Sequence, residues 1–494
     1  MIPLEDPDGT AHDPESCGCT GRGVNPAVPA RSATLGRLDT STAATTAARS
    51  DASTGQRHAH FGRWLGAIAV AALVVRVLFT VVVDPSIGES PDELSDPRAY
   101  HLIGKNLSEG RGYVRPFDLE LLGLEHPSAE YPPLFPAFLA VLDGAGVDSV
   151  DGQQLALCLV GSLTVLGIGL VGRRVGGDAV GLTAAAIAAI YPNLFQADAV
   201  LMTESPHALL VTVATLLAFR AADRPSRATF AALGLALGLG ALSRSEGALF
   251  APLLVLPLAL LLRDRSRATR LGLAAVALAV ALAVVAPWTI RNYVRFDAFV
   301  PISNNVGPTI DGANCDLTYS GTYLGYWRST FGDTAAESDE CFEGFDITQD
   351  GFNEAETAAF HRDAGLRYAR DHASRLPVVA MARLGRAFGF YDTFDQVRLE
   401  SLEGRTVRWQ TLGLRMYWLL LPFAVAGAVL VRRRTDLVPL LTPFVLVAIT
   451  VVLTHGNERF RISAEPALVV LAAMGAVAAV RAARHRIDRQ GANR

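Results

Sequence analysis

The feature that most constrains this chain is a series of apolar runs, each close to the length that crosses a lipid bilayer. A helix of about 20 apolar residues spans the hydrocarbon core, and inside lipid the backbone must satisfy its own hydrogen bonds. Of the 494 residues, 50% are hydrophobic and 19% are charged, whereas charged residues make up about 25% of soluble domains. The sequence therefore predicts an all-α polytopic membrane protein.

We expect about ten transmembrane helices joined by polar links. The runs lie near residues 64–83, 154–172, 178–192, 204–220, 228–243, 247–262, 271–287, 412–431, 437–454 and 465–481. They predict a transmembrane module over 61–287, a loop domain of mixed structure over 288–411, a second module over 412–482 and a tail over 483–494. Residues 1–60 are nearly devoid of large apolar side chains, which predicts a disordered arm.

Arginine placement predicts the orientation. Five links or ends that would share one side of the membrane are rich in arginine, and short cytoplasmic loops carry such an excess. They contain Arg173 and Arg174; Arg220, Arg224 and Arg227; Arg263, Arg265, Arg267 and Arg270; Arg432, Arg433 and Arg434; and Arg481, Arg484, Arg486 and Arg489. Both termini are then cytoplasmic in a multi-pass protein of the cell membrane, and loops 84–153 and 288–411 lie outside.

The long outer loop contains two helix-like stretches and two cysteines. The stretches lie over 354–372 and 377–390. Cys315 and Cys341 are the only pair predicted outside, where an oxidising compartment permits a disulfide. We expect these two residues to be bridged rather than to remain free thiols.

An acidic cluster follows the first apolar run. It comprises Asp92, Glu93 and Asp96, with Tyr100 one helical turn further on. Because Pro97 follows Asp96, one interpretation is a helix N-cap. The other is a general base, since an ionised carboxylate at the membrane face can accept a proton from a hydroxyl. Tyr100 would face the same cleft.

Further charged residues lie at the predicted outer ends of the helices. Glu204 either begins a helix or presents an acid that binds sugar hydroxyls or a metal, and Arg244 ends another outer helix. Arg291, Arg459 and Arg461 lie at headgroup depth against the positive-inside trend, and guanidinium groups match phosphate oxygens. The alternative for these arginines is binding to ordinary anionic lipids.

One arginine lies inside a span. Arg76 is near the outer end of the run over 64–83. Intramembrane arginine usually faces a partner or a cavity, and the alternative is snorkelling to the interface.

Taken in order, these motifs resemble the GT-C class of polyprenyl-phosphate-sugar-dependent glycosyltransferases, in the branch of protein O-mannosyltransferases and aminoarabinose transferases. The matching segments are Asp96-Pro-Arg-Ala-Tyr100, Glu130-Tyr-Pro-Pro133, Thr203-Glu204, Arg244-Ser-Glu246, Pro287-Trp-Thr-Ile-Arg291-Asn292-Tyr293 and Glu458-Arg-Phe-Arg461.

The resemblance implies an inverting hexosyl- or pentosyltransferase with its site at the outer membrane face. Asp96 would be the base, although Asp92 competes for that role. Donor and acceptor would be bound by Tyr100, Glu130, Glu204, Arg244, Arg291, Asn292, Arg459 and Arg461.

The expected partners are a polyprenyl-phosphate sugar, a glycan, lipid or protein acceptor, and membrane lipids. No cofactor is certain, and a divalent metal is left open. The net charge of −4 gives no sign of a nucleic-acid partner. The alternative function is a multi-pass transporter of a lipid-linked or polar substrate, for which internal repeats and midplane ionisable groups are expected.

Overall fold

The computed structural model describes residues 40–83, 95–328, 341, 352–401 and 405–492, with side chains from residue 59 to residue 490. The chain divides into two compact units, Met1–Arg57 and His58–Arg494. The described part of the first unit is helical. It belongs to α1 (Thr40–Val83), which begins inside the arm that the sequence predicted to be disordered. Asp92 and Glu93 lie outside the described residues.

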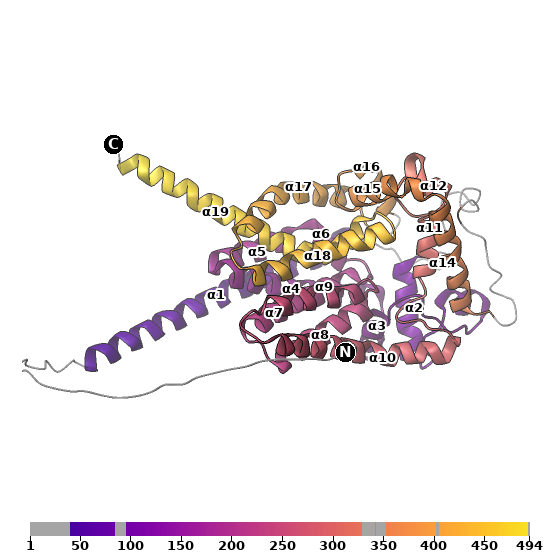
Figure 1. The fold of residues 1–494 in the computed structure, drawn as a ribbon, viewed down its shortest axis with the longest axis horizontal. Coiled ribbons are helices and arrows are strands. Elements are labelled where there is room, and N and C mark those ends of the chain that lie inside the picture. Colours follow the sequence, from indigo (N-terminus) through magenta and orange to yellow (C-terminus); the bar gives the residue numbers. More distant parts are fainter. Residues whose placement is uncertain (1–39, 84–94, 329–340, 342–351, 402–404, 493–494) are drawn as a thin grey trace, which may run out of the picture. The chain divides into compact units, whose positions relative to one another are not determined.

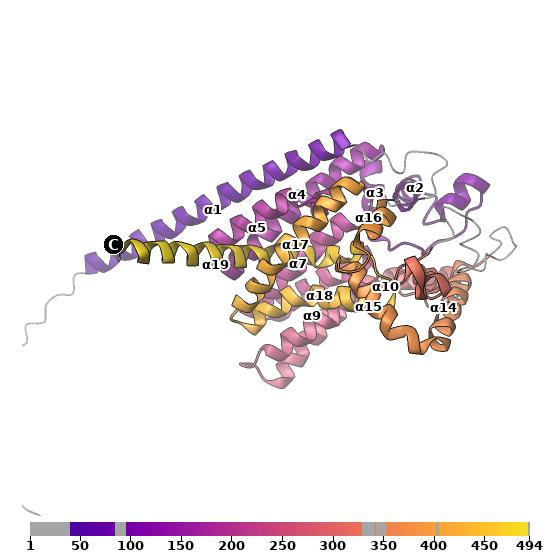
Figure 2. The ribbon, with the colours of Figure 1, turned by 90° about the horizontal axis from the view of Figure 1, so that it is seen from above.

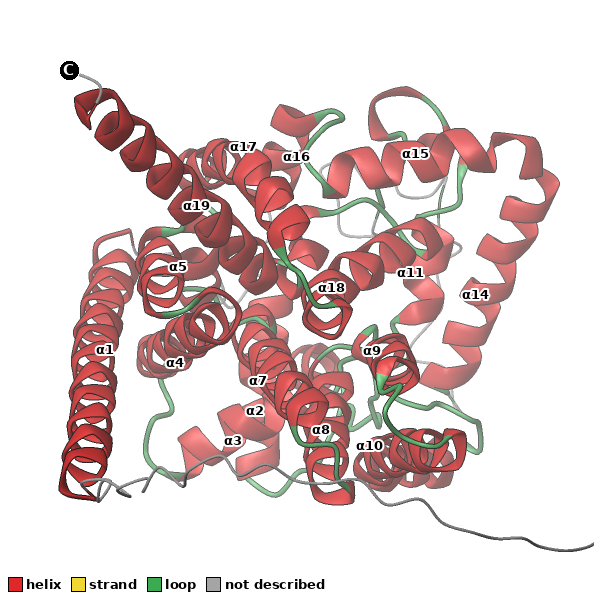
Figure 3. Cartoon of the chain, turned by 60° about the vertical axis from the view of Figure 1, so that its left-hand side comes forward, coloured by secondary structure: helices red, strands yellow, loops and turns green. Residues whose placement is uncertain are grey.

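The second unit is built from helices, and Figure 3 shows no strand in the part of the chain that is described. The all-α class is confirmed. After α1, the segment before α4 holds α2 (Asp96–Ser108), the π-helix η1 (Asp118–Leu122) and α3 (Leu134–Gly144). An isolated β-bridge pairs Val114, before η1, with Pro127, after it.

The membrane helices follow in two groups. The first group is α4 (Val150–Gly176), α5 (Asp178–Ile190), α6 (Pro192–Phe195), η2 (Gln196–Asp198), α7 (Glu204–Asp223), α8 (Arg227–Ser243), α9 (Gly247–Leu261) and α10 (Arg267–Phe296). The second is α17 (Val407–Leu430), α18 (Arg434–Leu453), the 3-10 helix η5 (Glu458–Ser463) and α19 (Glu465–Ala492).

Every predicted run forms a helix, but the count of ten spans is not confirmed. Among the described residues, seven helices are long and apolar enough to cross a membrane: α1, α4, α7, α10, α17, α18 and α19. An eighth is possible as a broken span, because α5 and the segment Pro192–Asp198 are bent by 61°. The other two, α8 and α9, have only 17 and 15 residues, so each falls short of about 30 Å of hydrocarbon.

Close helix contacts hold the bundle together. One core cluster joins α1, α4, α5, α17 and α19, and a second joins α7, α8, α9 and α10. At the α17–α19 crossing, a Cβ added to Gly427 would clash with the carbonyl oxygen of Leu471. Small residues let membrane helices approach in this way, because dispersion contacts replace the hydrophobic effect inside lipid.

The long loop is largely helical in its described residues. It contains α11 (Val306–Gly312), α12 (Asp316–Tyr319), η3 (Gly321–Tyr323), α14 (Glu354–Asp371), η4 (Ala373–Arg375), α15 (Leu376–Ala387) and α16 (Thr393–Ser401). Cys315 and Cys341 form the disulfide predicted for this loop, with Cα atoms 5.3 Å apart. Figure 1 shows α2, α11, α12 and α14 gathered at one end of the bundle of the second unit, and Figure 2 shows α2 and α14 at that end from above.

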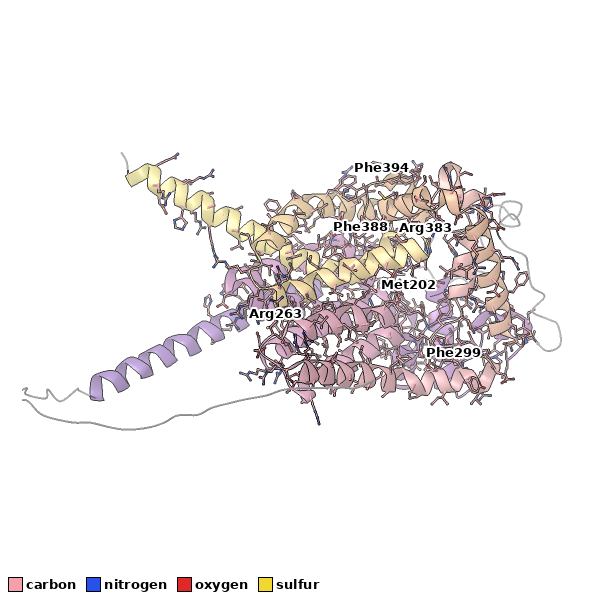
Figure 4. The ribbon with its side chains drawn as sticks, viewed as in Figure 1. Met202, Arg263, Phe299, Arg383, Phe388 and Phe394 are labelled. Atoms are coloured by element: carbon pink, nitrogen blue, oxygen red, sulfur yellow. A yellow bond between two sulfur atoms is a disulfide. The ribbon has the colours of Figure 1, made fainter. Side chains whose placement is uncertain are left out.

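The arginine-rich links lie at the opposite end of the bundle. Arg174, near the end of α4, pairs with Asp223 of α7 at 2.5 Å and with Asp436 of α18 at 3.4 Å, so three of these links meet. In Figure 4, Arg263 lies at this end, while Phe299 and Arg383 lie at the loop end.

Candidate active site

Asp96 is the first residue of α2, and its side chain contacts two charged or polar neighbours. Ser95 occupies the N-cap position, and Pro97 follows inside the first turn. One oxygen of Asp96 accepts a hydrogen bond from Tyr131 Oη at 2.8 Å, and the other lies 3.6 Å from Arg459 Nη1. The Asp96 side chain is 40% exposed. The carboxylate thus faces a partly solvated space and is not the N-cap.

Glu204 is the centre of an arginine cluster. It opens α7, is 1% exposed, and presents a single oxygen, Oε1, to three guanidinium groups. Arg459 Nε lies at 2.7 Å, Arg244 Nη1 at 3.2 Å and Arg405 Nη2 at 3.7 Å from that oxygen. These arginines come from η5, from the link between α8 and α9, and from the residues just before α17. A buried carboxylate needs such partners, since an unpaired charge is costly to desolvate.

A small pocket opens beside this cluster. Its lining is Ala197, Val200, Met202, Glu204, Arg405 and Arg459. The second carboxylate oxygen, Glu204 Oε2, is buried without a hydrogen-bond partner among the described residues. Figure 4 places Met202 toward the loop end of the bundle. The pocket therefore combines two cationic groups, Arg405 and Arg459, with the carboxylate of Glu204.

Arg405 was not predicted from the sequence. It lies in none of the motifs. Its partners Glu204 and Glu400 are not three or four residues away from it in the sequence, so no helical pairing pattern pointed to them. The one signal available was its position, because an arginine beside the predicted outer end of a helix runs against the positive-inside trend.

A second charged cluster lies next to Asp96, around the segment that carries Tyr131. Arg115 Nη1 lies 3.9 Å from Glu130 and 3.4 Å from Glu354. Desolvation by the surrounding protein raises the pKa of Glu130 to about 7, against the opposing effect of Arg115. Burial also raises the pKa of Tyr131 well above its ordinary value, with Asp96 adding to the effect. Tyr131 is therefore a neutral phenol that donates to Asp96.

Arg291 and Asn292 donate hydrogen bonds to backbone carbonyl oxygens around this second cluster. Arg291 donates to the carbonyl oxygens of Ser128 at 2.6 Å and Tyr113 at 2.8 Å. Asn292 is buried and donates to the carbonyl of Val300 at 3.2 Å. The contacts of both residues place them around the segment before Tyr131, rather than in the pocket of Arg459.

Tyr100 and Arg461 complete the predicted set. Tyr100 packs its ring 4.6 Å from that of Tyr131, and burial, with Asp96 nearby, raises its pKa. Arg461 is 1% exposed, pairs with Glu465 at 2.7 Å and stacks on the ring of Tyr417 at 4.0 Å.

The predicted residues thus fall into three places. The structure brings together Asp96, Tyr100, Glu204, Arg244 and Arg459. It places Glu130, Arg291 and Asn292 in the adjoining cluster and Arg461 within the protein interior. The described residues contain no group of three or more His, Cys, Asp or Glu placed to hold a metal ion.

Comparisons with known proteins bear on the family of the chain. The family model for dolichyl-phosphate-mannose-protein mannosyltransferases matches residues 130–290. This segment includes Glu204 and Arg244, while Asp96, Arg405 and Arg459 lie outside it. No curated protein matches the sequence.

Several solved structures are similar to the chain, among them an AglB and an ArnT structure. The oligosaccharyltransferase AglB of Archaeoglobus fulgidus, in complex with an inhibitory peptide and a dolichol-phosphate, is 15% identical, with a TM-score of 0.49. The match covers 87% of this chain and 52% of that one, so this chain spans about half the length of AglB. ArnT of Cupriavidus metallidurans, bound to undecaprenyl phosphate, is 14% identical over 83% of this chain and 77% of its own, with a TM-score of 0.39. The predicted resemblance to the GT-C class of glycosyltransferases is confirmed through the match over residues 130–290.

Proposed function

We propose that the protein is an integral-membrane glycosyltransferase that moves a sugar from a polyprenyl-phosphate donor to an acceptor hydroxyl, with inversion. The observation that carries the proposal is the convergence of Asp96 with Arg459, Arg405 and Glu204 beside one pocket at the loop end of the bundle. The family match, whose description names dolichyl-phosphate-mannose, supports the donor class.

The chemistry requires one base and stabilisation of one leaving group. The acceptor oxygen attacks the anomeric carbon while the bond from that carbon to the phosphate oxygen breaks. The proton of the acceptor hydroxyl passes to Asp96, and the electron pair leaves with the polyprenyl phosphate. Attack from the face opposite the leaving group inverts the configuration. A positioned base contributes roughly 10²- to 10⁴-fold to such a step.

The cations have a separate role in this scheme. Arg405 and Arg459 line the pocket, and guanidinium donors match phosphate oxygens in pairs. They would stabilise the charge that develops on the leaving phosphate. Arg244 does not line the pocket, but it shares Glu204 with Arg459 and so fixes the position of that carboxylate. The unpartnered oxygen of Glu204 would accept a hydrogen bond from a hydroxyl of the transferred sugar.

The remaining roles follow the sequence predictions. Glu130, Arg291 and Asn292 would act from the adjoining cluster, and Arg461 from its buried position within η5. The acceptor would be a glycan, a lipid or a protein, and the sugar a hexose or a pentose. The arginine-rich end would face the cytoplasm with both termini, which would put the pocket on the extracytoplasmic side of the cell membrane.

The test is a transfer assay on purified protein in nanodiscs. A panel of radiolabelled polyprenyl-phosphate hexoses and pentoses is supplied with lipid, glycan and peptide acceptors, and released polyprenyl phosphate is measured. We expect turnover with at least one donor, and loss of donor binding in Arg405→Gln and Arg459→Gln. Full binding and turnover in both variants would contradict the assignment of the phosphate site. Glu109→Gln, an exposed acid at the end of α2, is the matched control for intact folding.

A further inference from the structure

The corner between α15 and α16 contacts two membrane helices well inside their length. The carbonyl of Gly389 accepts a hydrogen bond from Trp418 Nε1 of α17 at 2.9 Å. A Cβ added to Gly389 would lie 2.8 Å from Leu414 Cδ1, also on α17. On the other side, Ala387 packs in one cluster with Val447 and Val451 of α18. The corner therefore packs against both helices.

The number of residues along each helix gives an estimate of the depth of this corner in the membrane. Trp418 is twelve residues from Leu430, the last residue of α17 before the arginine-rich link, and this is about 18 Å at 1.5 Å per residue. Val447 is about 20 Å from Arg434, the first residue of α18, on the same rise. The hydrocarbon core is about 30 Å thick, and any tilt of the helices reduces the depth they reach. With Leu430 and Arg434 taken as the opposite boundary of the hydrocarbon core, both helices would place the corner roughly 10 Å or more below the boundary on the loop side.

Large apolar side chains project outward from this corner. Phe390 is 64% exposed and Phe394 is 58% exposed, and Met381 on the preceding helix is 68% exposed. Figure 4 shows Phe394 at the outer rim of the second unit, beside α16. The neighbouring helix α17 also exposes apolar side chains, through Leu419 and Val429. The corner and the helix packed against it therefore both expose apolar side chains.

Several polar groups of the corner are paired within the protein. Gly389 has a φ of 69°, and the amides of Phe390 and Tyr391 both donate to the carbonyl of Gly385. Arg386 turns inward, donates to the carbonyl of Thr322 at 2.6 Å and pairs with Asp392 at 2.6 Å. Irregular backbone is tolerated at membrane depth only where its polar groups are satisfied in this way.

We propose that the corner over residues 387–394 is inserted into the leaflet on the loop side and contacts lipid acyl chains through Phe390, Tyr391 and Phe394. The loop over 288–411, predicted to lie wholly outside the membrane, then has one membrane-embedded segment.

The insertion also bears on the pocket. α16 continues from the corner to Glu400, which pairs with Arg405 at 3.2 Å. The lipid contact would set the height of Arg405 relative to the bilayer. The insertion itself does not depend on the proposed enzymatic activity.

Site-directed spin labelling tests the insertion directly. In a background in which Cys17, Cys19 and Cys158 are replaced by alanine, a nitroxide is attached to Phe390→Cys or Phe394→Cys in nanodiscs. Collision rates with oxygen, which enters lipid, and with a neutral nickel chelate, which stays in water, are then measured. Val425→Cys on α17, which is 59% exposed and five residues inside Leu430, is the lipid reference, and Arg370→Cys, exposed on α14, is the aqueous reference.

We expect the Phe390 label to match the lipid reference, with high oxygen and low nickel collision, and the Phe394 label to lie closer to the headgroups. Nickel collision at Phe390 equal to that at Arg370 would overturn the proposal. Both side chains are exposed, so the substitutions remove little packing. If the Phe390 variant does not fold, Tyr391→Cys decides by the same comparison.

Discussion

The buried ion pair between Arg76 and Asp198 resolves the two interpretations of the arginine inside the first span. Arg76 Nε lies 2.7 Å from Asp198 Oδ2, and both side chains are nearly inaccessible. Arg76 also donates to the carbonyls of Ala72 and Ala189. The arginine therefore faces a partner and does not snorkel to the interface. The pair ties α1 to η2, next to the segment that lines the pocket.

Breaking this pair should be costly because one charge stays buried alone. Arg76→Met or Asp198→Asn is expected to lower the free energy of unfolding by about 3–5 kcal/mol, and the double variant should recover part of the loss. Thermal unfolding in the same detergent micelles gives the stability of the wild type, of both single variants and of the double variant. Arg63→Met, an exposed arginine on the same helix, should change stability by less than about 0.5 kcal/mol. Additive losses in the double variant would show that the two side chains do not act as a pair.

Glu458 predicts a pH dependence of stability. Burial raises the pKa of Glu458 from 4.5 to about 8, so the folded protein holds a proton that the unfolded chain has already released. The folded state then binds more protons between these values, and its stability falls as pH rises through this window. The melting temperature of wild type relative to Glu458→Gln should decrease from about pH 5 to about pH 8. A difference that does not change with pH would contradict the raised pKa.

The sequence predicted part of the candidate site and missed part of it, for physical reasons. Asp96, Glu204 and Arg459 were predicted because a charged residue beside an apolar run is energetically unfavourable unless it has a partner or a functional role. Arg405 was missed because its partner Glu204 is remote in the chain. The grouping of Arg291 with the segment before Tyr131 depends on backbone carbonyls, which no residue pattern reveals.

The crossing of α17 and α19 depends on glycines, which have no side chain to separate the two helices. A Cβ added to Gly427 would meet the carbonyl oxygen of Leu471, and one added to Gly475 would meet that of Phe423. No rotamer change can relieve a clash with backbone, so an added methyl group must push the helices apart.

Gly427→Ala is therefore expected to destabilise the protein by about 1–3 kcal/mol. Gly272→Ala is the matched control, because a Cβ at Gly272 on α10 meets nothing within 4 Å. Alanine should there be neutral or stabilising by up to about 1 kcal/mol, since glycine costs helix entropy. Unfolding of both variants in one detergent gives the comparison. Equal stability for the two would mean that α17 and α19 are not closely packed.

Helices were easier to predict than spans. Apolar runs identified each membrane helix, and the stretches over 354–372 and 377–390 became α14 and α15. The number of spans was not predictable from the runs, because α8 and α9 are apolar but short, and because the chain bends by 61° between α5 and the segment that begins at Pro192. The depth of the corner after α15 depends on packing against α17 and α18, which the chain acquires only when folded.

At the scale of the molecule, the bundle of the second unit has two chemically different ends. The arginine-rich links meet at one end through Arg174, and the pocket of Arg459 and Glu204 opens at the other. This separation is what the positive-inside trend predicts for a site on the extracytoplasmic face.

Accessibility to a membrane-impermeant maleimide tests this orientation. In intact cells, with the free cysteines replaced, Arg370→Cys on α14 should be labelled, while Arg265→Cys in the link after α9 should be labelled only after the membrane is permeabilised. Both side chains are exposed, so burial does not limit either reaction. Labelling of Arg265→Cys alone in intact cells would reverse the orientation and place the pocket in the cytoplasm.

The most direct test of the proposed base is the effect of Asp96→Asn on donor binding and on sugar transfer, measured on the same purified protein. The substitution keeps the shape of the side chain and an oxygen that can accept from Tyr131, but removes the base. We expect unchanged affinity for the polyprenyl-phosphate sugar and transfer slower by about 10²-fold or more. Transfer at the wild-type rate in a folded Asp96→Asn protein would contradict the assignment of Asp96 as the base.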